Sequence, residues 1–206
     1  FLNVLKVNSK LLMDTSGSMI LLFGIASLMK GALIMKAEKK WKRGNGEVIT
    51  TNEMIKIVAD YIRKNPEAAY DITIGTDSQT HKYCCMVEVI CICRIGDGGI
   101  FFFRREDIPK IRVLKEKIVE ETNRSIENAT GFIDALQEEL LEDNIDLDIM
   151  FDEDRLAFAV HADIGRRGKT KELIKEICAW IEASGFEARI KPDSYAASGV
   201  ANMLSK

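Results

Sequence analysis

Residues 70–79 read YDITIGTDSQ, and this stretch decides how the rest of the chain is interpreted. Ile72 and Ile74 alternate with polar residues, a pattern typical of a strand, yet the strand leads through a glycine to Asp77. One interpretation is a turn, because Gly, Asp and Ser are common turn formers. The other is a carboxylate delivered on purpose at the end of a core strand. The remaining sequence has to decide between them.

The composition is that of one globular domain of ordinary size. Of the 206 residues, 47% are hydrophobic and 30% are charged, which excludes a disordered or fibrous chain. The net charge of −3 gives no global basic signal, which weakens a nucleic-acid partner without removing it. The five cysteines show no CxxC spacing and only two histidines are present, which argues against a zinc site. Reduced thiols predict a cytoplasmic protein.

The first 34 residues differ from the rest. The chain starts with Phe1, and the apolar run over residues 19–35 is interrupted by Lys30, so it is short for a membrane span. We expect residues 1–34 to be an extension, either the product of a mis-assigned start or an apolar leader. Residues 35–206 are then the domain, with no membrane contact expected. The alternative is a real hydrophobic anchor.

Hydrophobic periodicity predicts the order of the elements from residue 47 onward. Three strands joined by hairpin signals are followed by a long helix, and strands then alternate with helices, which predicts a mixed sheet with helices on its faces. The predicted helices are 47–65, 110–142, 168–184 and 194–206, and the predicted strands are 70–77, 83–95, 99–107, 155–165 and 186–193, with a short strand extension at 147–151.

Three aspartates follow predicted strands. Asp77 and Asp163 each come after an apolar stretch, at the carboxyl end of a strand, where open α/β sheets bind their ligands. Asp193 follows the last strand, in KPDSY. It either joins the other two or caps the final helix, and the sequence alone favours neither role.

The long helix offers several glutamates, and helical geometry selects one of them. With an advance of about 100° per residue, Glu121 lies within about 20° of Leu114 and Phe132 on the predicted buried face. Glu120 and Glu127 point away from that face. Because a glutamate on a buried stripe needs a positive partner, we select Glu121.

Converging carboxylates need a cation, because like charges do not share a dry site unpaired. Oxygen ligands alone favour Mg²⁺ or Mn²⁺ over zinc. The sequence therefore predicts a divalent metal site of Asp77, Glu121, Asp163 and Asp193. Two such ions would activate a water and stabilise the leaving oxygen in phosphodiester cleavage.

The order of these carboxylates resembles that of the RNase H-like superfamily. The stretches IGTDSQ, HADIGRRGKTKELIKEI and GFEARIKPDSYAASGVANMLSK are similar to the YkuK-like bacterial family of RNase H-like domains, over about residues 40–206. The resemblance implies an α/β fold with a mixed five-stranded sheet and helices on both faces. It matches Asp77, Asp163 and Asp193 directly to the acidic positions of the superfamily, whereas Glu121 rests on helical geometry. The chain departs from the superfamily in lacking strong basic character.

Several neighbours of these carboxylates are further candidates. His161 shares a strand face with Asp163 and either tunes the metal site or is a packed strand histidine. His81 either reaches the same edge or belongs to a loop. The candidates for holding substrate are Ser78, Arg166, Arg167, Lys169 and Lys191, and for the basic group after Asp163 a solvated turn is the alternative.

The sequence thus predicts a metal-dependent nuclease acting on RNA, an RNA–DNA hybrid or structured DNA. One alternative is a non-catalytic module that keeps the fold and binds nucleic acid or a protein. The other is hydrolysis of a small phosphorylated molecule, which suits a net acidic chain better than a polymer substrate does. The sequence does not determine the oligomeric state.

Overall fold

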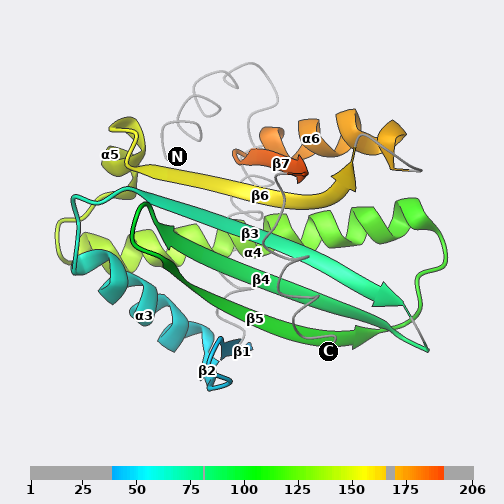
Figure 1. The fold of residues 1–206 in the computed structure, drawn as a ribbon, viewed down its shortest axis with the longest axis horizontal. Helices are drawn as coiled ribbons and strands as arrows, with labels where there is room; N and C mark the ends of the chain where they lie inside the picture. Colours follow the sequence, from blue (N-terminus) through cyan, green and yellow to red (C-terminus); the bar gives the residue numbers. More distant parts are fainter. Residues whose placement is uncertain (1–38, 81, 166–169, 193–206) are drawn as a thin grey trace, which may run out of the picture.

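The computed structural model describes residues 39–80, 82–165 and 170–192 (Figure 1). Its elements follow in the order β1 (Lys40–Arg43), β2 (Val48–Thr50), α3 (Thr51–Arg63), β3 (Tyr70–Thr80), β4 (Cys84–Arg94), β5 (Gly99–Ile108), α4 (Leu114–Leu141), α5 (Leu147–Asp152), β6 (Leu156–Gly165), the 3-10 turn η1 (Lys171–Leu173), α6 (Ile174–Ala183) and β7 (Glu187–Lys191). The predicted helix 194–206 and the extension 1–34 lie outside the described residues, so both stay predictions.

All seven strands form one mixed sheet in the order β2-β1-β5-β4-β3-β6-β7. The pairs β3–β6 and β6–β7 are parallel and the others are antiparallel. The mixed α/β sheet is confirmed, with β3 at the centre of the five strands from β5 to β7. The expected count of five was too low, because β1 and β2 add an edge hairpin. These strands have four and three residues, too few for a periodic pattern.

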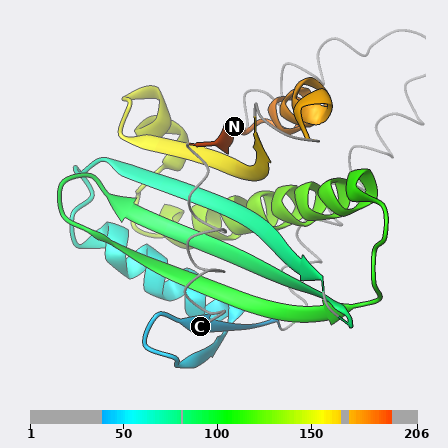
Figure 2. The ribbon, with the colours of Figure 1, turned by 45° about the vertical axis from the view of Figure 1, so that its right-hand side comes forward.

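The described long helices pack on one face of the sheet (Figures 1 and 2), so the helices expected on both faces are found on one face only among the described residues. One continuous apolar cluster joins α3, α4 and α6 to alternate residues of the strands; its largest members include Trp41, Met54, Ile72, Ile74, Phe102, Phe132 and Leu136. A smaller cluster of Val87, Val89 and Phe103 lies on the opposite face of β4 and β5. The sheet therefore separates the main core from a second apolar surface.

The three predicted helices that lie within the described residues are confirmed with small changes. Thr50 and Glu53 form a reciprocal capping box that begins α3. The long helix α4 continues unbroken through Gly131. Leu114 was wrongly placed on the buried face: it is the first residue of α4 and 41% exposed, because the buried stripe begins one turn later, at Ile118.

The predicted strand extension at 147–151 was wrong. These residues form the short helix α5, in which the Asp146 side chain accepts a hydrogen bond from the Asp148 N–H. Within the described ranges, no helix combines the length and apolar character needed to cross a membrane.

Candidate active site

The parallel pair β3–β6 places two of the predicted carboxylates together. The paired registers end at Gly75 and His161, and Asp77 and Asp163 are the next residues of the same face on each strand. Figure 1 shows the two strands diverging beyond this point. The sequence suggested that Asp77 ends the strand, but β3 continues for three residues beyond it. The two aspartates therefore flank the opening between diverging strands.

This position disfavours the charged form of the Asp77 carboxyl. Burial raises its pKa, and the negative charge of Asp163 raises it further. The Ser78 N–H donates to Asp77 Oδ1 at 2.7 Å, and Lys117 and Lys191 act in the opposite direction to burial. Partial burial next to a like charge is the condition under which a carboxylate attracts a cation.

Glu121 is buried as helical geometry predicted, with 6% of the residue exposed. Its Oε1 atom lies 3.6 Å from Lys117 Nζ and accepts no hydrogen bond from the described residues. The pKa of Glu121 is raised to about 7, and burial is the largest cause of the rise. The charges of Asp77 and Asp163 add to it, whereas the Ser78 hydroxyl and Lys117 act against it. A buried carboxylate short of partners is the feature expected of a ligand.

The neighbouring glutamates of α4 point elsewhere, as predicted. Glu120 accepts a hydrogen bond from Arg124 Nε at 2.7 Å, and Glu127 accepts one from Asn123 at 3.1 Å. Neither is buried as Glu121 is. The helical face chosen from the sequence is therefore confirmed for this part of α4.

Glu121 and the two aspartates approach from different sides of β3. The Thr76 hydroxyl accepts a hydrogen bond from Ser125 of α4 at 3.0 Å, so Thr76 faces the helix. Strand alternation then turns Asp77 to the opposite face. Among the residues the structure describes, no three His, Cys, Asp or Glu side chains are grouped closely enough to hold a metal ion. Asp193, the fourth predicted carboxylate, lies outside them.

Two lysines supply the positive charge in this region. Lys191 Nζ lies 2.6 Å from Asp163 Oδ1, which raises the pKa of the lysine. Lys117 Nζ donates to the Ser78 carbonyl at 2.7 Å, next to Asp77 in the chain. Lys191, predicted to hold substrate, is thus placed at the carboxylates.

The other predicted residues are placed less directly. Ser78 is buried at the interface with α4, so its role in binding substrate stays a prediction. His161 is buried on the face that carries Asp163, and burial, with the charge of Arg189, lowers its pKa to about 4. It is therefore neutral at pH 7, beside the Asp71–Arg189 ion pair. The remaining candidates, His81, Arg166, Arg167 and Lys169, lie outside the described residues.

Sequence reasoning missed a second buried carboxylate, Glu88 of β4, which is 1% exposed. Arg104 binds it through two hydrogen bonds of 2.6 and 2.7 Å, Asn128 donates at 2.6 Å, and Arg124 donates at 3.1 Å. Burial raises the pKa of Glu88, but these partners outweigh it and the pKa lies below its usual value. The available signal was a lone glutamate inside the apolar run CCMVEVICIC.

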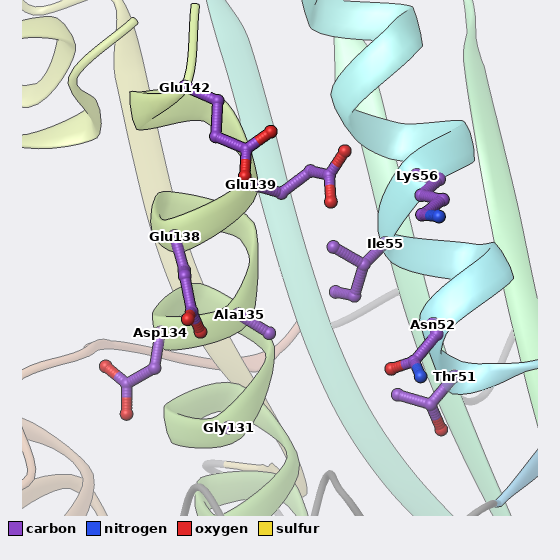
Figure 3. A pocket seen from close by; sticks show the side chains of 10 residues that line it. All are labelled: Thr51, Asn52, Ile55, Lys56, Gly131, Asp134, Ala135, Glu138, Glu139 and Glu142. Atoms are coloured by element: carbon purple, nitrogen blue, oxygen red, sulfur yellow. The ribbon is translucent and has the colours of Figure 1, made fainter. Parts of the chain in front are cut away.

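An acidic pocket of ≈ 340 Å³ lies between α3 and α4 (Figure 3). Its α4 side carries Asp134, Glu138, Glu139 and Glu142, and its α3 side carries Lys56. Burial raises the pKa of Asp134. The pocket follows the C-terminal half of α4, whereas Glu121 lies in the second turn. Its charge repels polyanions, so phosphate groups would be held elsewhere.

Comparison with known proteins agrees with this architecture. A family model described as Ribonuclease H-like matches residues 53–206. The chain is also 35% identical, over 162 residues, to the "Uncharacterized protein YkuK" of Bacillus subtilis (strain 168), which covers 77% of this chain and 92% of that protein. No solved structure matches significantly. The matched residues include β3, α4 and β6, so this chain belongs to the Ribonuclease H-like family, as its sequence motifs suggested.

Proposed function

We propose that this protein is a divalent-metal-dependent phosphodiester hydrolase that cleaves RNA, an RNA–DNA hybrid or structured DNA. The observation that carries the proposal is the placement of Asp77 and Asp163 on one face of β3 and β6, just past their last paired residues. Burial and the neighbouring charge raise the pKa of Asp77. Two partly buried carboxylates close together are unfavourable by themselves, and a bound cation would stabilise them.

The donors suit Mg²⁺ or Mn²⁺ in their chemistry, because all are carboxylate oxygens. Glu121 approaches from the other side of β3, and its Oε1 is buried without a hydrogen bond from the described residues. Asp77 and Asp163 would hold the ion, with Glu121 and Asp193 as the further predicted ligands. When bound, the ion would neutralise phosphate charge and lower the pKa of a water molecule.

The chain's own groups have separate tasks in this proposal. The sheet fixes Asp77, whose Oδ1 accepts the Ser78 N–H. Glu121 is proposed as a further ligand, and a cation beside it would lower its raised pKa. Lys191 is half exposed and supplies a positive charge for substrate phosphate. Arg166, Arg167 and Lys169 are proposed to extend this basic contact.

The test is cleavage of end-labelled single-stranded RNA, RNA–DNA hybrid and branched DNA with Mg²⁺ or Mn²⁺. We expect Asp77→Asn and Asp163→Asn to lower kcat by at least about a hundredfold, because each loses a charge that would hold the ion. Glu120→Gln is the matched control, since Glu120 bonds Arg124 and points away. Cleavage that survives Asp77→Asn and Asp163→Asn would refute the proposed site.

One observation favours a second candidate, a non-catalytic module that binds nucleic acid. Lys191 Nζ lies 2.6 Å from Asp163 Oδ1 and neutralises that carboxylate. If Asp163 serves only to pair with Lys191 and does not bind a metal, the protein would bind labelled RNA or DNA equally well with Mg²⁺ or with a chelator. It would then cleave neither. Binding together with metal-dependent cleavage would exclude this candidate.

A further inference from the structure

The position of Lys191 is built into the backbone of β6 and β7. The register between these strands shifts between Ala162 and Gly165, and the shift brings Lys191 opposite Gly165. A Cβ atom on Gly165 would lie 3.4 Å from Lys191 Cβ and 4.0 Å from Lys191 Cδ. The lysine stem therefore lies against the bare glycine, which directs its ammonium back toward Asp163.

The ammonium of Lys191 contacts one of the proposed metal ligands. Its Nζ lies 2.6 Å from Asp163 Oδ1. The two lysines differ in exposure. Lys117 donates to the Ser78 carbonyl and is 25% exposed, whereas the Lys191 side chain is 51% exposed. Lys191 is thus the cation with the more direct access to solvent.

We propose that Lys191 is the resident counter-ion of the Asp77–Asp163 pair and exchanges with the divalent cation when that cation binds. The inference rests on the proposed function. A divalent ion coordinated by Asp163 Oδ1 and an ammonium at 2.6 Å from the same oxygen repel each other, so one displaces the other. The displaced ammonium stays nearby, because the backbone of Lys191 is paired with Gly165. It then faces the phosphate that the metal attracts.

The exchange predicts that removing the lysine charge tightens metal binding. The measurement is the Kd of Mn²⁺ for the full chain by isothermal titration calorimetry, without substrate. For Lys191→Met, which keeps the aliphatic stem over Gly165, we expect a Kd about two- to fivefold lower, the scale of a partly exposed ion pair. Lys191→Arg keeps the charge and should restore a Kd near that of the wild type.

Lys115→Met is the matched control, because the Lys115 side chain is about as exposed as that of Lys191 and pairs with Glu176 at 2.9 Å. Its Mn²⁺ affinity should not change. Thermal melting of each variant shows whether it is folded, and Lys191→Gln replaces Lys191→Met if the latter is not.

The outcomes separate the two proposals. If the wild type binds Mn²⁺ but Lys191→Met binds it equally or more weakly, the counter-ion inference is overturned and the proposed metal site stands. If the wild type binds no Mn²⁺, or Asp77→Asn binds it as tightly as the wild type, the metal site itself is overturned and the inference with it. If Mn²⁺ binds more tightly to Lys191→Met than to the wild type, and Lys191→Arg restores the wild-type affinity, both proposals are supported.

Discussion

Glu88 and Glu121 both lie at the interface between the sheet and α4, yet their pKa values are shifted in opposite directions. Both are almost fully buried, and burial by itself raises the pKa of each. Glu88 receives hydrogen bonds from two arginines and an asparagine, and its pKa is lowered. Glu121 has Lys117 at 3.6 Å, and its pKa rises to about 7.

The difference teaches how to tell a structural carboxylate from a functional one in this domain. Burial selects both residues, so burial does not distinguish them. The distinguishing property is whether the protein itself completes the hydrogen bonds of the buried group. Glu88 is completed by Arg104, Arg124 and Asn128, whereas Glu121 Oε1 accepts no hydrogen bond from the described residues.

The largest effect on stability is expected at Glu88. Glu88→Ala should lower the free energy of unfolding by about 3 kcal/mol, because Arg104 and Arg124 lose a buried partner. Both arginines keep Glu106 nearby, which limits the loss. Urea denaturation measures the change, with the exposed Glu138→Ala as control. Equal losses from the two variants would show that the Glu88 network stabilises nothing.

Glu121 should instead make stability depend on pH. The folded protein keeps the Glu121 proton up to a pKa of about 7, whereas a reference carboxyl releases it near 4.5. Wild type therefore gains stability relative to Glu121→Gln as the pH falls from 8 to 5, by about 2 kcal/mol, and loses it as the pH rises through 7. Urea denaturation of both proteins at several pH values tests this. Parallel pH curves would contradict it.

Asp77→Asn should change stability less, and in the favourable direction. Replacing one of two neighbouring carboxylates relieves repulsion, which should raise the free energy of unfolding without metal by about 1 kcal/mol. Added Mg²⁺ should then stabilise the wild type more than the variant. Melting curves with and without metal decide this. A variant less stable than the wild type would show that Asp77 is held by partners, as Glu88 is.

The smallest effect is expected from residues outside both regions. A chain beginning at Met35 should be soluble and melt within a few degrees of the full chain, because the apolar run over 19–35 is shorter than a membrane span requires. Differential scanning calorimetry of the two chains compares them. Precipitation of the shorter chain would mean that residues 1–34 contribute to the core.

The sequence was sufficient for features that depend on local periodicity. The apolar alternation around Ile72 and Ile74 predicted β3, and the similar pattern before Asp163 predicted β6, which pairs with β3 in the structure. Helical angles separated Glu121 from Glu120. In both cases one element's own pattern carries the information, because side-chain direction follows from the backbone repeat.

Features that depend on contacts between distant segments were not accessible in this way. The partners of Glu88 come from β5 and from α4, sixteen and thirty-six positions along the chain. The α5 segment LDIMF is too short for its period to separate helix from strand, and the Asp146 cap settles it. Alternation places Asp77 and Ser78 on opposite faces, but the face that α4 covers is decided only by packing.

The ladder around β3 has a consequence for how the protein opens. From Tyr70 to Gly75 the strand is hydrogen-bonded to β6 on one side and β4 on the other, but from Thr76 to Thr80 the described pairing continues with β4 alone. Amide hydrogens near Ile72 should exchange with deuterium only through global unfolding, whereas those beyond Asp77 should exchange faster through local opening. The candidate site thus lies where the sheet can open locally while the core stays folded.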